Sequence, residues 1–474
     1  MNKTFFILVA AQIVVLFDIA VTQTVKADEQ PVTGELSPSA DSVVFQHSTL
    51  SAVRDQVPDN ESAPVSSPEE MTIKRNDATG YMARILADSS VRTAKGSSVS
   101  ANGPDESVVI ARNGGTVVMQ ECNIAKEGFS SDISDSRFNG RNATVLGNNS
   151  TIQLTDSSIS STGEGATAVF STANATITVE HVLISTFEDS SGGLYANHGG
   201  TINAQDVSIS TQGQHSAALR CSYGEGFIFI NGAQLNTTGN ASPCIYSSGV
   251  IKASNVVGMA VGSEIAVVEG KNAVILERAE LTGRVNNGIM LYQNADDETA
   301  NGVASFTAKD SILTNLSEGP MFFVTNTRAD IYLENTKLNS NSEILLRSAA
   351  GKWGAEGRNG GNTTLNCVNQ ELRGQITADN LSTVTLNLKG NSRFQGTFNG
   401  NFSAREANIS LEKNAVWSLT GNARVDSLLD EDPSLSNISS YGFNIYYNEN
   451  RCPQFEGKII PLPGGGKLEP QVFY

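Results

Sequence analysis

Four acidic residues recur at the same point of a repeated sequence phrase and are the first candidates for chemistry. They are Glu121, Asp156, Asp206 and Asp310. Inverting hydrolysis of a glycosidic bond uses two carboxylates about 6.5–9.5 Å apart, and neighbouring repeats can provide such a pair. Other copies of the phrase carry His181, Gly232 and Arg278 at this point. Residue types this varied are typical of a turn, so we predict no catalytic residue in this column.

The remaining candidates are three histidines and two acidic clusters. His181, His198 and His215 follow one another at intervals of 17 residues, whereas the phrase recurs after about 25. The three imidazoles are therefore expected at different positions around the repeat, which does not favour a shared metal. The acidic clusters are in expected loops and comprise Glu188-Asp189 and Asp296-Asp297-Glu298. We predict no metal site and no cofactor.

The chain has five cysteines, an odd number without metal-finger spacing. They are Cys122, Cys221, Cys244, Cys367 and Cys452. In the repeat register Cys244 stacks on Ala218, three residues before Cys221, so these two thiols are not expected to be bridged. A stack of repeats has a continuous core and needs no disulfide framework. We predict no defining disulfide and no cysteine chemistry.

The phrase that positions these residues reads apolar-x-apolar-x-turn-small-x-apolar. Three adjacent copies are Thr176–Ile184, Thr201–Ile209 and Phe227–Leu235, which begin 25 and 26 residues apart. Alternation with a period of two predicts a β-strand that buries one face. Self-similarity at a fixed period in the range of roughly 20–50 residues predicts a repeat architecture.

About twelve copies of the phrase follow one another, and most precede a second short apolar run such as Ala168–Phe170. Two or three short strands per repeat, closing after about 24 residues, are typical of a parallel β-helix. We therefore predict an all-β, single-stranded parallel β-helix of about twelve coils. Its interior is expected to contain one aliphatic ladder, formed by Ile177, Ile202, Ile228 and Ile251.

Composition divides the chain into four segments. A positive start, a short apolar run and a small-x-small sequence predict a signal peptide at 1–27. Residues 28–105 are rich in Ser, Pro, Asp and Glu, which predicts a disordered spacer. The β-helix is predicted at 106–420. Residues 421–474 break the pattern and are predicted to cap the open end of the stack.

Three repeats are longer than the others, so loops are expected to project from the stack. The insertions lie near Glu127–Asn142, Gln293–Asn301 and Ala349–Gly361. Insertions in repeat proteins commonly lie on a binding face. We expect recognition to use these loops together with the polar flank of Ser, Thr and Asn.

The formal net charge of −17 restricts the partners. Nucleic acid and anionic membranes bind clustered Lys and Arg, so both are disfavoured. After the signal peptide, no stretch approaches the roughly 18 apolar residues that a membrane-spanning helix needs. We expect a secreted chain, extracellular or at the cell surface, without membrane insertion after signal cleavage.

Several motifs resemble a known family. Gly-Leu-Tyr-Ala at 193–196, Gly-Gly-Thr-Ile at 199–202 and the run at 262–270 resemble bacterial adhesin-like right-handed β-helix proteins. The resemblance extends over about 107–474 and includes the pectin-lyase-like superfold and autotransporter passenger regions. It implies a right-handed helix and a non-enzymatic role in adhesion, extracellular binding or structure. The implied partner is an extracellular glycan or a host or matrix protein.

The same superfold implies a second hypothesis, because it includes polysaccharide lyases and glycoside hydrolases. Lyases of this fold are similar in using calcium-binding Asp clusters with an Arg or Lys base. The arginines at hand, Arg278, Arg284 and Arg328, are scattered and none accompanies an Asp pair in the register. An enzyme is therefore the alternative, to be favoured if acidic or basic side chains converge in one cleft.

Overall fold

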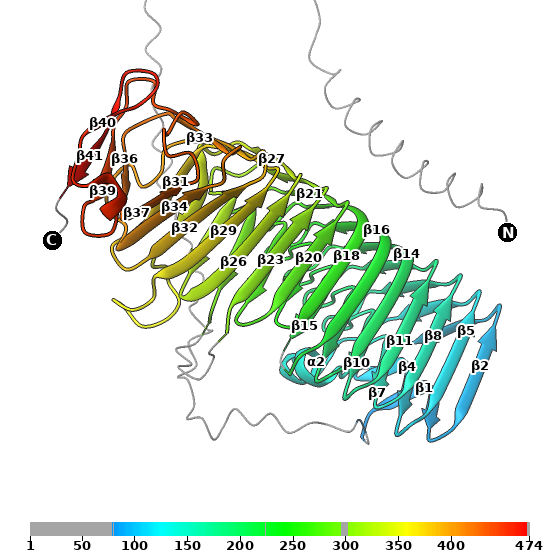
Figure 1. Ribbon diagram of the computed structural model, residues 1–474. Helices are drawn as coiled ribbons and strands as arrows, with labels where there is room; N and C mark the ends of the chain where they lie inside the picture. Colours follow the sequence, from blue (N-terminus) through cyan, green and yellow to red (C-terminus); the bar gives the residue numbers. More distant parts are fainter. Residues whose placement is uncertain (1–77, 79, 223, 295–301, 472–474) are drawn as a thin grey trace, which may run out of the picture. The chain divides into compact units, whose positions relative to one another are not determined.

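The structure is a computed structural model that describes residue 78 and residues 80–222, 224–294 and 302–471. These residues form a parallel β-solenoid of about fifteen turns, as Figure 1 shows. The predicted signal peptide and the part of the predicted spacer before residue 78 lie outside the described residues. The all-β parallel fold is confirmed, with more coils than the twelve expected.

The first face of the solenoid is a sheet of twelve parallel strands. These strands are β1 (Met82–Asp88), β4 (Glu106–Arg112), β7 (Val145–Asn148), β10 (Val169–Thr172), β13 (Leu194–Asn197), β15 (Leu219–Ser222), β17 (Ile245–Ser247), β19 (Ala266–Glu269), β22 (Ile289–Tyr292), β25 (Phe322–Thr325), β28 (Ile344–Ser348) and β31 (Gln375–Ala378). From β10 to β28 they coincide with the second apolar run of each predicted repeat.

The second sheet has 21 strands and contains the repeated phrase. Its strands are β2 (Val91–Lys95), β3 (Ser98–Ala101), β5 (Thr116–Gln120), β6 (Asn123–Lys126), β8 (Thr151–Thr155), β9 (Ser158–Ser161), β11 (Thr176–Glu180), β12 (Leu183–Thr186), β14 (Thr201–Thr211), β16 (Phe227–Thr237), β18 (Val250–Ala260), β20 (Ala273–Glu277), β21 (Glu280–Gly283), β23 (Ala304–Lys309), β24 (Ile312–Asn315), β26 (Thr327–Glu334), β27 (Lys337–Ser340), β29 (Gly361–Val368), β32 (Thr383–Lys389), β34 (Glu406–Leu411) and β37 (Ser427–Asp430). In seven coils of the described chain two of these strands follow one another across two residues, whereas β14, β16 and β18 are single strands of 11 residues.

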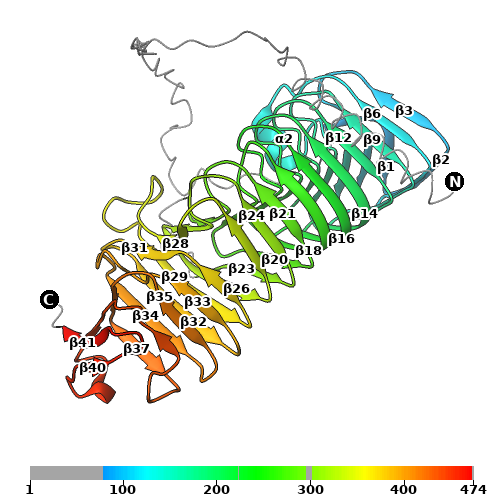
Figure 2. The same cartoon turned by 90° about the horizontal axis from the view of Figure 1, so that it is seen from above.

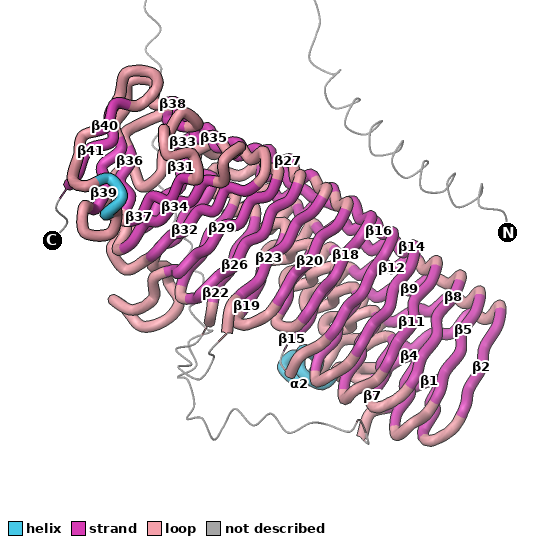
Figure 3. The backbone as a smooth tube through the Cα atoms, in the orientation of Figure 1, coloured by secondary structure: helices cyan, strands magenta, loops and turns pink. Residues whose placement is uncertain are grey.

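Two four-stranded sheets complete the C-terminal part. One contains β30 (Glu371–Arg373), β33 (Arg393–Gly396), β35 (Val416–Leu419) and β38 (Ile438–Ser439). The other contains β36 (Ala423–Val425), β39 (Ile445–Asn448), β41 (Lys467–Gln471) and β40 (Ile460–Pro461). The described residues contain one α-helix, α2 (Ile133–Asn139), and the short 3₁₀ turn η1 (Pro453–Phe455). Figure 3 shows that strands predominate in this part of the chain.

The predicted aliphatic ladder is confirmed by the register of the strands. Ile177 pairs with Ile202, Ile202 with Ile228, and Ile228 with Ile251, and all four side chains are buried. Each coil alone exposes this face, so the stack forms one continuous core from coil to coil. The alternation that predicted the strands therefore also determines which side chains point inward.

The residues after the second apolar position of the phrase occupy a tight left-handed turn, as their variety predicted. Asp156, His181, Asp206 and Arg278 all have φ between 49° and 54°, and Gly232 has φ 74°. Asp, Asn and Gly accept this conformation most readily because of their short polar side chain or missing Cβ. The column is thus a turn that repeats along the solenoid.

The solenoid begins earlier than we predicted. Strand β1 pairs with β4, β2 with β5 and β3 with β6, so residues 82–105 form the first coil although composition placed them in the spacer. A terminal coil has a neighbour on one side only, and most side chains of β2 are exposed. Its strands therefore lack the apolar alternation on which the prediction depended. At the other end β37 still pairs with β34, inside the predicted cap.

Two of the three predicted insertions cover the outward face of the twelve-stranded sheet. Helix α2 lies in the first insertion, and the amide of Asn197 on β13 donates to the carbonyl of Phe138, 2.8 Å away. In the third insertion the Trp353 ring packs on Tyr292 of β22, with centroids 4.8 Å apart. Figures 1 and 2 show α2 and this yellow-green loop on the same side of the coils. Most of the second insertion, residues 295–301, lies outside the described residues.

Candidate functional site

The sequence candidates for catalysis do not form one site. His181 lies between two aspartates of neighbouring coils, with Nδ1 3.3 Å from Asp156 and Nε2 3.7 Å from Asp206. Its side chain is 53% exposed, which is typical of a surface turn. His198 and His215 occupy other corners of the coil, as their spacing predicted. Among the described residues, no three His, Cys, Asp or Glu side chains are grouped so as to hold a metal ion.

The remaining charged candidates also have local roles or lie outside the described chain. The Asp189 carboxylate accepts a hydrogen bond of 2.7 Å from the backbone N–H of Gln214 one coil on, which fixes a turn. Arg278 donates to Asn255 of the preceding coil at 2.9 Å. The cluster at residues 296–298 lies outside the described residues. Sequence reasoning therefore found the turns but no site.

The five cysteines are free and buried. Cys244 is the neighbour of Ala218 in the register, because Leu219 pairs with Ile245, so the predicted offset from Cys221 is confirmed. Burial raises the pKa of the Cys244 thiol to about 12 and raises the pKa of Cys221 and Cys367 further. Thiols in such surroundings are poor nucleophiles.

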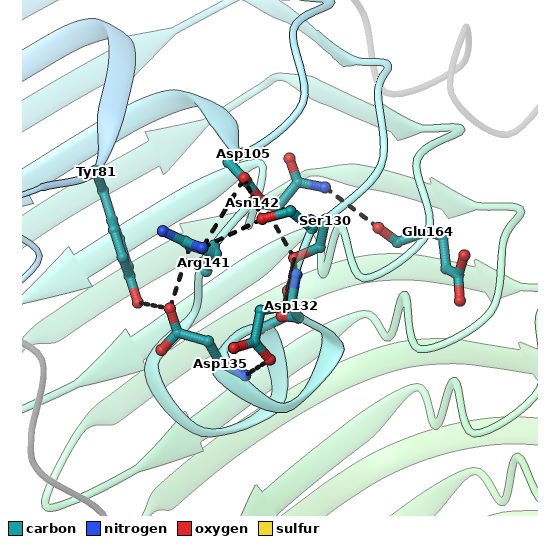
Figure 4. Close-up of polar contacts among 10 residues, drawn as sticks. Tyr81, Asp105, Ser130, Asp132, Asp135, Arg141, Asn142 and Glu164 are labelled. Atoms are coloured by element: carbon teal, nitrogen blue, oxygen red, sulfur yellow. Dashed lines mark hydrogen bonds and ion pairs between the residues drawn. The ribbon is translucent and has the colours of Figure 1, made fainter.

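A dense polar network surrounds helix α2, as Figure 4 shows. The Tyr81 hydroxyl donates to Asp135 at 2.8 Å, and Arg141 Nε lies 3.2 Å from the same carboxylate. Asp105 accepts from Ser131, whose backbone N–H is 2.9 Å away. Burial, followed by the hydrogen bond to Asp135, raises the pKa of the Tyr81 phenol well above its ordinary value.

Each charged group of this network has a partner inside the network. The Asp132 carboxylate caps the N-terminus of α2 by accepting from the N–H of Asp135 at 2.9 Å. The side chain of Asn142 donates to the carbonyls of Gly128 and Glu164. We interpret this network as the set of hydrogen bonds and ion pairs that holds the first insertion against the coils, and not as a binding site.

A cleft opens in the solenoid where one ladder of strands is interrupted. In the described chain β27 pairs with β24 below it but with no strand above it, and β30 pairs only with β33 of the next coil. The cleft between them has a volume of about 1100 Å³. Its lining residues are Met321, Asn335, Thr336, Lys337, Leu338, Asn339, Ser340, Ser342, Glu343, Leu345, Asn369, Glu371, Arg373, Gly374, Gln375, Gln395, Thr397 and Thr420.

Gln370 holds one end of this cleft open. In other coils a Ser at this point accepts a hydrogen bond from the coil below, as from Ala279 N–H to Ser311 Oγ at 3.0 Å. Here the Thr336 N–H donates to Oε1 of Gln370 at 2.9 Å, and Gln370 is itself buried. The glutamine side chain is two bonds longer than serine, so the backbones of the two coils separate while their hydrogen bonding is kept.

The other end of the cleft is closed by a direct backbone contact. The N–H of Gln375 donates to the carbonyl of Glu343 at 2.7 Å. Next to it Gly374 has φ 112°, and a Cβ there would lie 2.5 Å from the Glu343 oxygen. Glycine is therefore required where the ladder rejoins. Within this wall β27 contributes four residues of extended chain, roughly 13 Å.

The walls carry charges that form no ion pair with any residue that the structure describes. Ile331 pairs with Leu365, so Lys337 and Glu371 occupy equivalent positions of successive coils. In an intact ladder they would be cross-strand neighbours, yet no ion pair joins them within the described chain. Arg373 and Glu343 are likewise exposed at the rim. Below these charges, Met321 and Leu345 are buried and form an apolar floor.

A shallow groove of about 210 Å³ adjoins the cleft and shares Glu371, Arg373 and Gln395 with it. Its far edge is formed by Arg393 and by Tyr441, whose side chain is 69% exposed. The two openings form one surface that presents cations, carboxylates, amides and an aromatic ring. Such a combination of groups is suited to binding an extended polar ligand.

This site was not predicted from the sequence, although two signals point to it. The insertion at 349–361 lies directly before the coil that forms the upper wall. The small position of the phrase, which is Ala279, Ser311 and Thr336 in the preceding copies, is occupied by Gln370 in this one. A long polar side chain at a position that is buried in other copies predicts a local change in the stacking.

No family model, no curated protein and no solved structure matches this chain. The helices among the described residues are too short and too polar to cross a bilayer.

Proposed function

We propose that the chain is a secreted or surface-associated, non-enzymatic binding protein of the adhesin-like β-helix type. The observation that carries this proposal is the cleft between β27 and β30 with its exposed, unpaired charges. Lys337, Arg373, Glu343 and Glu371 are available to a ligand because no side chain of the described chain neutralises them. The solenoid would then serve as a rigid support for this surface.

The dimensions of the cleft favour a polymeric ligand. Its volume of about 1100 Å³ exceeds the roughly 300–1,000 Å³ of small-molecule sites. Its open, elongated form continues into the groove beside Tyr441. Extracellular glycans and extended segments of host or matrix proteins are ligands of this kind, and the net charge of −17 disfavours nucleic acid.

The test is a binding survey with matched variants. Purified protein is incubated with a glycan array and a panel of matrix proteins, and K337A/R373A is compared with R92A/K413A. Both double variants remove two exposed positive charges, but only the first pair lines the cleft. We expect the cleft variant to lose at least 10-fold in affinity and the control to change less than twofold. Equal behaviour of the two variants would contradict the proposed site.

A carbohydrate-active enzyme is the second candidate, because Glu343 and Glu371 lie on opposite walls of one cleft. Two carboxylates across a groove are the minimum for general acid and base catalysis of glycoside cleavage. Product release from pectin, alginate and similar polymers, abolished in E343Q and E371Q, would favour this activity. If no polymer yielded a product, the enzymatic alternative would be rejected and the binding function would remain.

A further inference from the structure

We propose that the cleft accepts an extended segment of a partner protein as an additional β-strand between β27 and β30. This inference rests on the proposed binding function and identifies its ligand. An added strand is a known mode of peptide recognition, in which main-chain hydrogen bonds provide affinity and alternate side chains provide specificity. Here the peptide would meet a strand edge on each side.

The edge of β27 faces the cleft with unused backbone groups. The N–H of Lys337 donates to Ser311, and that of Asn341 donates to Asn315, both in the coil below. Successive residues of a strand point their N–H and C=O to opposite sides. The N–H and C=O of Leu338 and Ser340 therefore point into the cleft, where no strand of the described chain pairs with them.

The edge of β30 faces the cleft in the same way. The carbonyl of Gln370 accepts from Arg393, and the N–H of Gly374 donates to Gln395, both in the coil above. By the same alternation, the backbone groups of Glu371 and Arg373 point down into the cleft. The carbonyl of Glu371 accepts from the Gln370 side chain at 2.9 Å, which leaves its N–H and both groups of Arg373 for a ligand.

The side chains around these edges suit a short peptide with alternating character. Leu338 is partly buried, and with Met321 and Leu345 it forms the floor for the inward side chains of the peptide. Lys337 and Arg373 share the rims with Glu343 and Glu371, so the outward side chains of the peptide would lie beside groups of both charges, where polar residues are favoured. The exposed Tyr441 ring lies in the adjoining groove and not between the two strand edges. The unpaired backbone groups of β27 and β30 therefore favour a peptide over a glycan in the cleft itself.

A peptide with the sequence of residues 311–316, Ser-Ile-Leu-Thr-Asn-Leu, is the probe. This segment contains β24, the strand that already pairs with the other edge of β27. We expect the acetylated peptide amide to bind at least 10-fold more tightly than a copy methylated on the backbone nitrogens of its third and fourth residues. Those two amides point to opposite edges, and methylation blocks both hydrogen bonds while the side chains are unchanged.

Two protein variants and one exchange measurement complete the test. Because its N–H faces the cleft, proline at Leu338 removes no hydrogen bond to β24. We expect L338P to bind the peptide at least 10-fold more weakly than L338A, because both variants lose most of the apolar leucine side chain but only L338A keeps the backbone N–H. Circular dichroism checks that both variants are folded. In the wild-type protein, peptide binding should slow amide exchange at Leu338 and Arg373.

The outcomes separate this inference from the proposed function. Equal binding of the methylated and unmethylated peptides, or no peptide binding at all, would overturn strand addition. If K337A/R373A nevertheless lost affinity for a glycan, the proposed function would stand with a different ligand. If that variant bound every array and matrix ligand as the wild type does, the proposed function would fail as well.

Discussion

Single residues decide where this solenoid departs from regular stacking, and Lys126 is an instructive example. Its side chain is only 1% exposed, and its Nζ donates to the carbonyls of Gly103 and Gly128 at 3.1 and 3.0 Å, and also to that of Glu127. Burial is the main cause that lowers the pKa of Lys126 from 10.5 to about 8. Among the described residues no carboxylate contacts this ammonium, so no ion pair offsets the free energy that its removal from water costs.

Lys126 should make stability depend on pH in an alkaline window. Between pH 8 and 10.5 the unfolded chain binds a proton at this residue that the folded chain has released. Lys126 therefore increases the free energy of unfolding as the pH rises from 8 to 10.5. We expect the melting temperature of the wild type, measured relative to K126M, to rise by a few degrees from pH 7.5 to 10.

Comparison with K126M is needed because buried thiols act in the opposite direction. Cys221, Cys244 and Cys367 have raised pKa values, so ionisation of these thiols in the unfolded chain lowers stability as the pH rises. Both proteins carry these cysteines, so their contribution cancels in the difference. If the difference in melting temperature between the wild type and K126M stayed constant from pH 7.5 to 10, Lys126 would not titrate in this window.

The sequence marks Gln370 as an exception to the phrase, but the hydrogen bond that it makes and the role of Lys126 could not be assigned from the sequence, for a physical reason. Alternation identified Ile177, Ile202 and Ile228 because burial of an aliphatic side chain depends on its position in the strand alone. The role of Gln370 depends on a hydrogen bond to a residue 34 positions earlier, and that of Lys126 depends on three carbonyls of two turns. Such contacts are properties of the assembled coils.

At the scale of elements, each strand has an inward face that contributes most of its stability and an outward face that contributes little. On β16, Ile228 is fully buried in the ladder, while its neighbour Phe229 is 41% exposed on the outer surface. A hydrophobic side chain stabilises the fold in proportion to the apolar area that it removes from water. Phe229 is larger than Ile228, but it is expected to contribute less to stability because much of it stays exposed. The pair therefore provides a matched test of the alternation.

We expect I228D to destabilise the protein by more than about 3 kcal/mol, because an aspartate in the core is an unpaired buried charge. F229D should change the free energy of unfolding by less than about 1 kcal/mol, since the side chain stays in water. Chemical denaturation followed by circular dichroism measures both. A comparable loss of stability in F229D would show that the outer face of β16 is covered by another part of the protein.

The elements that the sequence predicted best are those whose neighbours are other copies of the phrase. The strands of the repeated phrase from β5 to β29 were anticipated, because their coils stack on other copies of the phrase, and only the side of β27 that faces the cleft is an exception. The first coil and the interruption above β27 were not anticipated, because a coil at an end or beside a cleft has a different neighbour. Helix α2 was expected only as an insertion, since its fold depends on contacts such as that between Tyr81 and Asp135.

At the scale of the whole solenoid, stability is a sum of coil contributions and of interfaces between neighbouring coils. Two ladders join the coils on either side of the cleft. One pairs β26 with β29, from Thr327–Gly361 to Glu334–Val368, and the other pairs β28 with β31. The third ladder is missing because β27 and β30 do not pair. This interface therefore has fewer paired strands than those around β14, β16 and β18, and coupling between its two sides should be reduced.

Trp417 allows this coupling to be tested. Its ring is fully buried between Phe394 and Phe398, with centroids 6.2 and 6.3 Å away, and its indole N–H donates to Gly396 at 3.1 Å. W417A should cost about 3–5 kcal/mol through lost packing. Hydrogen exchange measured by mass spectrometry should show faster exchange at 371–471 and unchanged protection at 106–334. Uniform loss of protection along the chain would show full coupling across the cleft.

The same interruption has a mechanical consequence. Under tension along the axis, most levels of the stack share the load among three rows of hydrogen bonds, whereas the level above β27 has two. Under such a load this level would resist less than the fully paired levels around β14, β16 and β18, and it lies next to the place where a ligand is held. A strand bound there would restore the missing row, so that the occupied molecule would resist force better than the empty one.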